Sequence, residues 1–318
     1  MKVIIKKIII GLLAFVSVIL LIISAWAAIQ HLRDPLDFIN LPISEMYIVQ
    51  DSVFHADFLP QQREYHVMKL TNDDIDEVNC VISYPENIPV EGLPVVIILG
   101  GLEIGHYTLG YIPDPGHNIV IIYQYPYHPE YWYTGTAINE IPAIRRSVLS
   151  VPAQVLTLRK WAADQNWSDE NRITILGYSF GALFIPAIYH LADKYHATIN
   201  HGVIAYGGVD LYHMLHANMS KFSEPWRSVI SWLAFTAIRG IEPAFYMSHL
   251  KAEFLLINGT LDHQIPEECW RELHRLTPDP KTIIILEEGH MHQRKTELTK
   301  RLVRLSQEWL IQKDAVNP

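Results

Sequence analysis

The chain has 318 residues, 49% of them apolar, so it is long enough to form one large domain with a sizeable core. Its formal net charge is −9, which gives no indication of a nucleic-acid-binding protein. The 16 histidines are scattered along the chain, and the sequence predicts no metal site and no cofactor. Its two cysteines, Cys80 and Cys269, lie too far apart in sequence for a disulfide to be inferred.

The N-terminus carries a long apolar segment. Lys2, Lys6 and Lys7 precede residues 8–29, a run of 22 residues without a charge, of which 14 are Ile, Leu, Val or Phe. About 20 apolar residues suffice to cross a bilayer as a helix, and the usual apolar run of a signal peptide has only about 7–15. The sequence therefore predicts a membrane anchor over residues 1–30.

The lysines before the run favour a cytoplasmic N-terminus, which places the rest of the chain on the exported side, whether periplasmic, extracellular or lumenal. The alternative is a signal peptide, because Ala25-Trp26-Ala27 resembles a small-x-small cleavage site, and cleavage near Ala27 would secrete the protein. Residues 31–45 contain two prolines and are interpreted as a tether. The remaining residues, 46–318, are expected to form one domain.

Short apolar runs rich in β-branched residues and separated by turn residues follow, and they are typical of strands. Two of them, 65–70 and 78–84, alternate in the manner of antiparallel edge strands. The full set of expected strands is 46–49, 65–70, 78–84, 95–99, 119–123, 173–176, 202–206, 254–257 and 282–286. Residues 144–165 are expected to form one or two helices, and a helical crossover between strands implies parallel pairing.

The segment from Arg172 to Ala182 has the most distinctive pattern in the chain. A buried strand ends at Gly177, and Gly177-Tyr178-Ser179-Phe180-Gly181 fits the G-x-S-x-G nucleophile elbow, with a helix expected at 182–191. Such a turn holds the serine in a strained conformation at the end of the sheet. Gly177 and Gly181 are needed because a Cβ there would collide with the neighbouring strand and helix. The pattern predicts Ser179 as a nucleophile.

Two further strands end in residues that would complete a catalytic set. Asp262 follows the strand at 254–257, and His290 follows the strand at 282–286. The carboxyl ends of parallel strands meet at one edge of a sheet, so these side chains are expected to lie near Ser179. A serine hydroxyl needs a base, an imidazole can take its proton and return it to the leaving group, and a carboxylate fixes the imidazole tautomer.

Alternatives exist for these roles. His292 lies two residues beyond His290, and Asp210 also follows a strand. The Gly-His pair at the strand end favours His290, and the tight loop around Asp262 favours that residue as the acid.

Backbone N–H groups are expected to stabilise the oxyanion. One would come from Phe180, the residue after the serine, and another from Gly101 in the Gly-Gly pair that follows the strand at 95–99, or alternatively from Leu102.

Two segments are candidates for the walls of a substrate cleft. An aromatic loop follows the strand at 119–123, and it either lines the cleft or covers the edge of the sheet. Its aromatic residues are Tyr125, Tyr127, His128, Tyr131, Trp132 and Tyr133. Residues 211–250 carry apolar and aromatic side chains at helical spacing, and they are interpreted as a helical cap inserted over the site.

From about Tyr65 to Leu310 the chain resembles the α/β-hydrolase superfamily. The stretch from Trp161 to Asp164 and the elbow at 177–182 look like its esterase, dienelactone-hydrolase and prolyl-oligopeptidase-like branch. The resemblance implies a mostly parallel sheet of about eight strands flanked by helices. The helical cap and the N-terminal helix, both expected from the hydrophobic pattern, are additions to it. It also implies that Ser179, Asp262 and His290 act as a triad. One departure is Leu99, which stands where many relatives carry a histidine before the paired glycines.

The leading hypothesis is a membrane-anchored serine hydrolase that acts on a small-molecule ester or thioester through an acyl-enzyme. Peptidase or amidase activity of the same fold is the second hypothesis. A catalytically inactive binding protein tethered to the membrane is the third, although no member of the triad is missing. The substrate and the oligomeric state are not indicated by the sequence.

Overall fold

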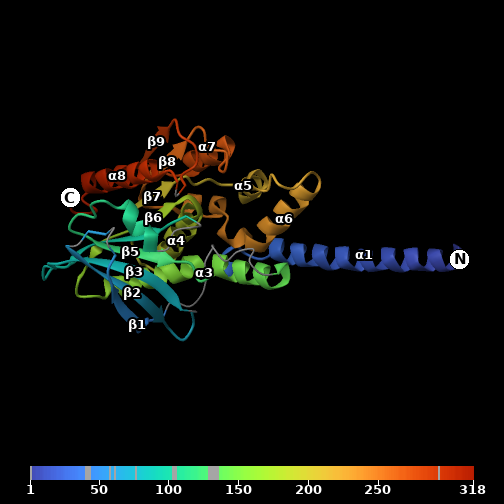
Figure 1. The fold of residues 1–318 in the computed structure, drawn as a ribbon, viewed down its shortest axis with the longest axis horizontal. Coiled ribbons are helices and arrows are strands. Elements are labelled where there is room, and N and C mark those ends of the chain that lie inside the picture. The colour runs from blue at the N-terminus through green and yellow to red at the C-terminus, as the bar shows by residue number, and fades with distance from the viewer. Residues whose placement is uncertain are drawn as a thin grey trace.

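The molecule is an α/β domain with one long helix that projects from it (Figure 1). The computed structural model describes residues 2–39, 44–56, 59–60, 62–75, 77–101, 106–127, 136–292 and 294–318. The projecting helix is α1 (Lys2–Leu32). The centre of the domain is a nine-stranded sheet with helices on both of its faces. Each of its strands overlaps one of the nine runs expected as strands, whereas the family resemblance implied about eight.

The sheet is mostly parallel, as predicted. Its strands are β1 (Tyr47–Phe54), β2 (Arg63–Thr71), β3 (Val78–Pro85), β4 (Leu93–Leu99), β5 (Ile119–Gln124), β6 (Ser168–Tyr178), β7 (His201–Ala205), β8 (Glu253–Gly259) and β9 (Lys281–Leu286). They lie in the order β1-β2-β3-β5-β4-β6-β7-β8-β9. Strands β5, β4, β6, β7, β8 and β9 are parallel to one another. The other three, β1 to β3, pair antiparallel, and β3 joins them to β5.

The strands separate two apolar cores, because alternate side chains of a strand point to opposite faces. Every residue of β4 is buried. Its Val95, Ile97 and Leu99 belong to the core that contains residues of α3 (Ala137–Ala163), α4 (Ile185–Lys194) and α7 (Glu267–Leu276). Its Val96 and Ile98 belong to the core under α8 (Thr296–Gln312). This burial on both faces explains the densely apolar run at 95–99.

Residues 144–165, expected to be helical, lie almost entirely within α3. This helix starts earlier than expected, at Ala137, and contains Pro142 and Pro152. A proline removes only one helical hydrogen bond, and the many buried side chains of α3 offset that loss.

The segment between β7 and β8, expected to be a helical cap, is helical. It contains α5 (Leu211–Asn218) and α6 (Trp226–Ile238), followed by the short 3-10 helices η4 (Arg239–Ile241), η5 (Pro243–Phe245) and η6 (Met247–His249). Both α5 and α6 lie on the side of the domain from which α1 projects (Figure 1).

The α1 helix is long and apolar enough, over Ile4–Leu32, to span a membrane or to serve as a signal sequence. Its C-terminal end packs on the domain, where Ala27 and Gln30 are buried. Arg239 Nη1 donates to the carbonyl oxygens of Gln30 (3.0 Å) and Arg33 (3.1 Å). A cation at this end of a helix also interacts favourably with the helix dipole.

The chain next to α1 contacts the domain as well. Within the expected tether at 31–45, residues Leu36–Ile39 form the short helix α2, and Ile39 is fully buried. Residues 40–43 of that segment lie outside the described part of the chain.

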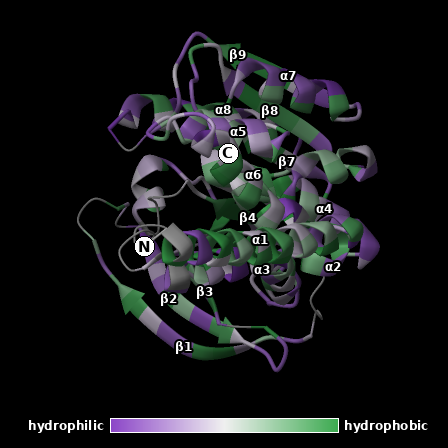
Figure 2. Cartoon of the chain, turned by 90° about the vertical axis from the view of Figure 1, so that its right-hand side faces the viewer, coloured by the Kyte–Doolittle hydropathy of each residue, from purple (hydrophilic) through white to green (hydrophobic). Residues whose placement is uncertain are grey.

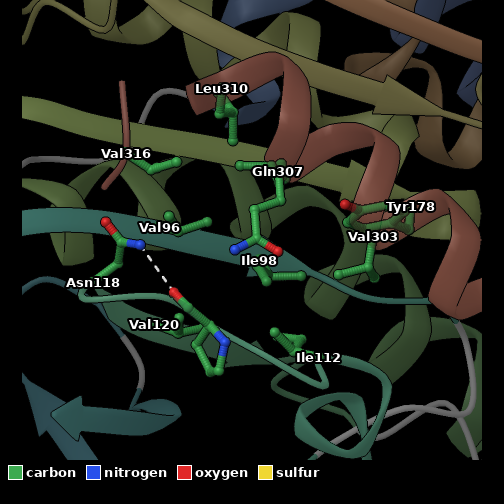
Figure 3. Close-up of a pocket in the computed structure, with 12 residues that line it drawn as sticks. Val96, Ile98, Ile112, Asn118, Val120, Tyr178, Val303, Gln307, Leu310 and Val316 are labelled. Carbon is green, nitrogen blue, oxygen red and sulfur yellow. Dashed lines mark hydrogen bonds between the residues drawn. The ribbon is translucent and has the colours of Figure 1, made fainter. Parts of the chain in front are cut away.

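A small apolar cavity of about 40 Å³ lies under α8, between that helix and the sheet (Figure 3). It is lined by Val96, Ile98, Ile112, Pro115, Asn118, Val120, Leu176, Tyr178, Val303, Gln307, Leu310 and Val316. A space of this size holds a water molecule or two and excludes an ester substrate. It is therefore a small gap in the packing of the core under α8.

Both cysteines are buried, unpaired thiols. Cys80 lies on β3 and Cys269 on α7, and both belong to the core that contains α3 and α4. Burial raises the pKa of the Cys269 thiol to about 12, with a smaller contribution from the nearby carboxylate of Asp210. Burial also raises the pKa of the Cys80 thiol. Neither thiol is ionised near neutral pH.

Candidate active site

Ser179 stands at the turn between β6 and the next helix, with the backbone strain expected of the elbow. Its φ is 53°, in the left-handed region that residues other than glycine rarely adopt. A 3-10 helix, η3 (Ser179–Phe184), begins at this residue and leads into α4. The helix predicted at 182–191 is therefore observed as α4 at Ile185–Lys194, and residues 182–184 belong to the tighter 3-10 turn before it.

The two glycines of the elbow are required by close packing. A Cβ on Gly181 would lie 2.2 Å from the carbonyl oxygen of Leu99 on β4. A Cβ on Gly177 would lie 2.5 Å from Ile185 Cγ1 and 2.6 Å from the carbonyl oxygen of Gly181. Such distances are far below van der Waals contact. The neighbouring strand and helix exclude side chains here, as the sequence pattern predicts.

The structure brings Ser179, His290 and Asp262 into one hydrogen-bonded chain. Ser179 Oγ lies 2.7 Å from His290 Nε2, and His290 Nδ1 lies 2.7 Å from Asp262 Oδ2. An ionised carboxylate can only accept a hydrogen bond, so Nδ1 carries the imidazole proton. Nε2 is then free to accept a proton from the serine hydroxyl.

The carboxylate of Asp262 is held rigidly. Its side chain is fully buried. Oδ1 accepts hydrogen bonds from the backbone N–H groups of Gln264 (2.7 Å) and Ile265 (3.1 Å), which leaves Oδ2 for the imidazole. Backbone bonds also connect the loops after β8 and β9, because Leu261 N donates to the carbonyl oxygen of Glu288 (3.0 Å). The acid and the histidine are thus positioned by one connected pair of loops.

The two alternative residues are occupied elsewhere. Asp210 caps the N-terminus of α5, accepting from the backbone N–H of His213 (3.2 Å), and its Oδ2 is hydrogen-bonded to the His213 ring. His292 Nδ1 accepts from the backbone N–H of Arg294 (3.1 Å). Of the candidate acids and bases, Asp262 and His290 are those that the structure joins to Ser179.

The peptide between Gly100 and Gly101 is fixed next to the elbow. The carbonyl oxygen of Gly100 accepts from the Tyr125 hydroxyl (2.6 Å) and from Gly181 N (3.1 Å). In a trans peptide the N–H points away from the preceding carbonyl, so these two bonds also set the direction of the Gly101 N–H. Gly101 is buried, and Phe180 starts the first turn of η3. Leu102, the alternative donor, lies outside the described residues.

Sequence patterns did not assign a specific contact to two tyrosines beside this site. Tyr125 was predicted only as part of an aromatic loop, whose residues 128–135 lie outside the described part of the chain. Its ring packs on that of Phe180, with centroids 5.2 Å apart, and burial raises the pKa of its hydroxyl, which therefore remains a donor.

The ring of Tyr206, at the end of β7, meets the His290 ring edge to face at 5.5 Å. Its φ of 56° is a second strained position at this edge of the sheet. Burial, and secondarily the nearby Asp262 carboxylate, raises the pKa of Tyr206, so its hydroxyl stays neutral. Tyr206 could have been suspected from its place at a strand end, but no motif marks it.

A buried histidine supports the strand ends that lead to Asp262. His274 Nε2 donates to Asn258 Oδ1 (2.9 Å), and Asn258 Nδ2 donates to the carbonyl oxygen of Gly207 (2.9 Å). These bonds connect α7, β8 and the end of β7. Burial, followed by the positive charges of Lys281 and Arg271, lowers the pKa of His274 to about 4.

The stability of the domain is expected to fall as the pH is lowered from 7 to 4. The pKa of His274 is below its ordinary value of 6.5, so its stabilising contribution is complete above about pH 6.5 and is lost as the pH falls toward 4. The expected loss in the free energy of unfolding is about 2–3 kcal/mol. Urea unfolding of wild type and His274→Gln measures it. The variant keeps a donor for Asn258 but does not titrate, so an equally steep pH dependence in both proteins would contradict this assignment.

The described residues contain no group of three or more His, Cys, Asp or Glu side chains arranged to hold a metal ion. The chain of hydroxyl, imidazole and carboxylate at this edge of the sheet has the groups that acyl transfer to a serine requires.

Comparison with solved structures reveals the same overall fold in esterases and a peptidase. An acetyl xylan esterase from a Thermoanaerobacterium species has a TM-score of 0.59 at 14% identity, over 88% of this chain and 93% of that one. An acetyl xylan esterase from a Paenibacillus species has a TM-score of 0.56 at 15% identity, over 90% and 92%. The Pyrococcus horikoshii acylaminoacyl peptidase has a TM-score of 0.55 at 15% identity, over 84% of this chain and 49% of that one. This chain thus matches about half of that peptidase.

Comparison with sequences gives the family. No curated protein sequence matches the chain. The family model of the prolyl oligopeptidase family matches residues 151–314, more than half of the 318 residues, and this range includes the elbow and both strand ends described above. Together with the mostly parallel sheet, these matches confirm the predicted α/β-hydrolase fold. The chain belongs to the prolyl oligopeptidase family of serine hydrolases.

Proposed function

We propose that the protein is a membrane-anchored serine hydrolase that cleaves carboxylic esters or thioesters through an acyl-enzyme. The observation that carries the proposal is the continuous chain from Ser179 Oγ through His290 to Asp262, with both bonds at 2.7 Å. Each donor and acceptor in it has the role that acyl transfer requires. A strained serine in the elbow adds support.

In the first half of the reaction, Ser179 Oγ attacks the carbonyl carbon while His290 Nε2 takes the hydroxyl proton. The oxyanion that forms would be stabilised by the backbone N–H groups of Phe180 and Gly101, each donor contributing about 3–4 kcal/mol to the transition state. The intermediate collapses, and His290 returns the proton to the departing alcohol or thiol. Asp262 stabilises the imidazolium cation throughout.

In the second half, water takes the place of the leaving group. His290 removes a proton from the water, which attacks the acyl carbon, and the proton then returns to Ser179 Oγ as the acid is released. The net reaction converts one ester and one water molecule into one acid and one alcohol, or one thioester and one water molecule into one acid and one thiol. It needs no redox step and no cofactor.

Peptidase or amidase activity is the second candidate, because the family model and the acylaminoacyl peptidase among the similar structures point to amide bonds as well. Esters are favoured because the acetyl xylan esterases match over nearly their whole length, whereas the peptidase matches over half of its own.

A substrate panel tests the proposal. We expect kcat/KM for p-nitrophenyl butyrate, divided by the uncatalysed rate in buffer, to exceed the same ratio for N-acetylalanine p-nitroanilide by at least about 100-fold. Both substrates release a p-nitro aromatic group, so one assay reads both. Ser179→Ala should lose at least about 10⁴-fold of either activity. A larger ratio for the anilide would favour the peptidase or amidase hypothesis. Full activity of the Ser179→Ala protein would reject both hypotheses, because both require Ser179 as the nucleophile.

The anchor belongs to the proposal as well. Residues 4–32 form one apolar helix whose end is bonded to Arg239 and Arg145 of the domain, as expected of a segment that remains part of the mature protein. We propose that the domain lies on the exported side. A mature N-terminus at Ala28 would instead indicate a signal sequence that is cleaved to secrete the protein.

A further inference from the structure

A large cavity lies at the base of α1, where its C-terminal end meets α3 and α6. Its volume is about 1070 Å³. Figure 2, viewed from the end of α1, shows this helix next to α3 and α6. None of Ser179, Asp262 and His290 lines the cavity, so it is distinct from the candidate active site.

One part of the cavity wall is apolar and belongs to the helices that meet there. Trp26 of α1, Ile141 of α3, and Ile230 and Leu233 of α6 line it. The side chain of Ile141 is 59% exposed. The apolar wall where these helices meet is thus partly exposed, and such a surface can bind a hydrocarbon chain.

The other part of the wall is basic. Arg33, which follows α1, and Arg145 and Arg146 of α3 line it together with a single acidic residue, Asp74. Arg145 is held by Ala237 O (2.9 Å) and Gln30 Oε1 (3.2 Å), and Arg33 stacks on the ring of Phe38. Among the described residues, none of the three arginines forms an ion pair with a carboxylate.

The positive charges therefore oppose one another. Burial, and next the charge of Arg33, lowers the pKa of Arg145. Three cations with one acidic residue beside them, Asp74, leave an excess of positive charge, and a bound anion would relieve the remaining repulsion. Phosphate oxygens fit guanidinium groups well because two parallel hydrogen bonds can form.

The position of the cavity along α1 indicates that the anion would be a lipid headgroup of the membrane. The apolar helix has 29 residues, which at about 1.5 Å per residue exceeds the bilayer core of about 30 Å. Trp26 lies near the C-terminal end of this span, at the place where tryptophan marks a membrane interface. Arg33 is the first residue after the apolar span, which ends at Leu32. The basic wall therefore lies at the level of the lipid headgroups.

The helix beside α1 supports the same orientation. On α6, Trp226, Val229 and Trp232 are 64%, 44% and 40% exposed. Trp232 stacks on His31 of α1, with ring centroids 6.2 Å apart. Exposed tryptophans next to a membrane helix are typical of residues that enter the interface.

We propose that this cavity binds an anionic phospholipid of the bilayer that α1 enters. The lipid phosphate would lie between Arg33 and Arg146, with Arg145 behind it, and an acyl chain would lie against Trp26 and Leu233. This inference rests on the proposed membrane anchor and is independent of the hydrolytic reaction.

The test uses the full chain, purified in dodecyl maltoside, and thermal unfolding as the readout. Adding phosphatidylglycerol at about 100 times its Kd should raise Tm by about 3–6 °C. Phosphatidylcholine, whose headgroup has no net charge, and inorganic phosphate should each raise it by less than about 1 °C. An equal effect of inorganic phosphate would identify a phosphate-ion site and overturn the lipid proposal.

Variants locate the effect. Arg33→Gln with Arg146→Gln should abolish the shift with phosphatidylglycerol, whereas Lys300→Gln with Arg304→Gln on α8, which removes the same charge, should keep it. Unchanged ester hydrolysis would show that both variants are folded.

Native mass spectrometry from nanodiscs of phosphatidylglycerol and phosphatidylcholine is a second test. It should show one phosphatidylglycerol molecule retained by the wild type and lost from the Arg33→Gln, Arg146→Gln variant. Equal retention by both variants would overturn the proposal. Absence of the wild-type protein from the membrane fraction would reject the anchor on which it rests.

Discussion

Asp262→Asn is expected to lower kcat for ester hydrolysis by about 10⁴-fold while KM and Tm stay nearly unchanged. Oδ1 of Asp262 accepts two backbone N–H groups, so the amide oxygen of an asparagine must take that place. Its NH₂ group then faces His290 Nδ1, which has to become an acceptor. The imidazole proton moves to Nε2, and the histidine can no longer take the proton of Ser179.

Asp210→Asn is the matched control for this prediction, because it makes the same chemical change at the other aspartate that follows a strand. Asparagine is as good an N-cap as aspartate, so α5 should remain intact. We expect less than about a threefold change in kcat. Steady-state kinetics with p-nitrophenyl butyrate and thermal unfolding by circular dichroism measure both variants. Loss of activity in Asp210→Asn together with an active Asp262→Asn would contradict the assignment of the acid.

Gly181→Ala is expected to destabilise the protein by about 3 kcal/mol or more, at the upper end of overpacking effects. The added Cβ would lie 2.2 Å from the Leu99 carbonyl oxygen and 2.6 Å from its carbon. These are backbone atoms of β4, which is paired on both sides and cannot move away. Movement of the elbow would also break the bond from Gly181 N to Gly100 O, so activity should fall with stability.

Gly11→Ala is the control for that substitution. It lies in α1, where an added Cβ meets nothing within 4 Å, and alanine is the better helix former. Its urea unfolding curve should coincide with that of the wild type, whereas Gly181→Ala should unfold at a clearly lower concentration. A wild-type midpoint for Gly181→Ala would show that β4 and the elbow are less closely packed than the structure indicates.

The sequence predicts the parallel strands well because each is a short apolar run that ends in glycine or a polar residue. The strand at 173–176 and the one at 254–257 were expected as buried strands, and they lie within β6 and β8. Because parallel strands share one edge for their carboxyl ends, the proximity of Ser179, Asp262 and His290 could also be expected. That proximity follows from topology and needs no knowledge of side-chain packing.

Contacts between segments far apart in the chain could not be predicted in this way. The bond from Tyr125 to Gly100 depends on β5 lying next to β4, and the ring contact of Tyr206 with His290 depends on two loops meeting. No local pattern encodes either of them. The helix expected at 144–165 also begins earlier than its pattern indicates, at Ala137, and Pro142 lies inside its first turns.

The same limitation applies to the base of α1. Two prolines suggested a tether at 31–45, but Phe38 and Ile39 pack against the domain core. Arg145 and Arg239 reach α1 from positions more than 100 residues away, and these bonds fix the orientation of the helix. The sequence predicts an apolar helix, and only the three-dimensional structure shows that its end is bonded to the domain.

Covalent labelling with a fluorophosphonate probe tests the identity of the nucleophile most directly, because the phosphorus reacts with an activated serine and not with an ordinary one. Peptide mapping by mass spectrometry should find a single adduct, on Ser179, and the Ser179→Ala protein should remain unlabelled. An adduct on another residue, or equal labelling of the two proteins, would contradict the assignment of Ser179 and with it the proposed reaction.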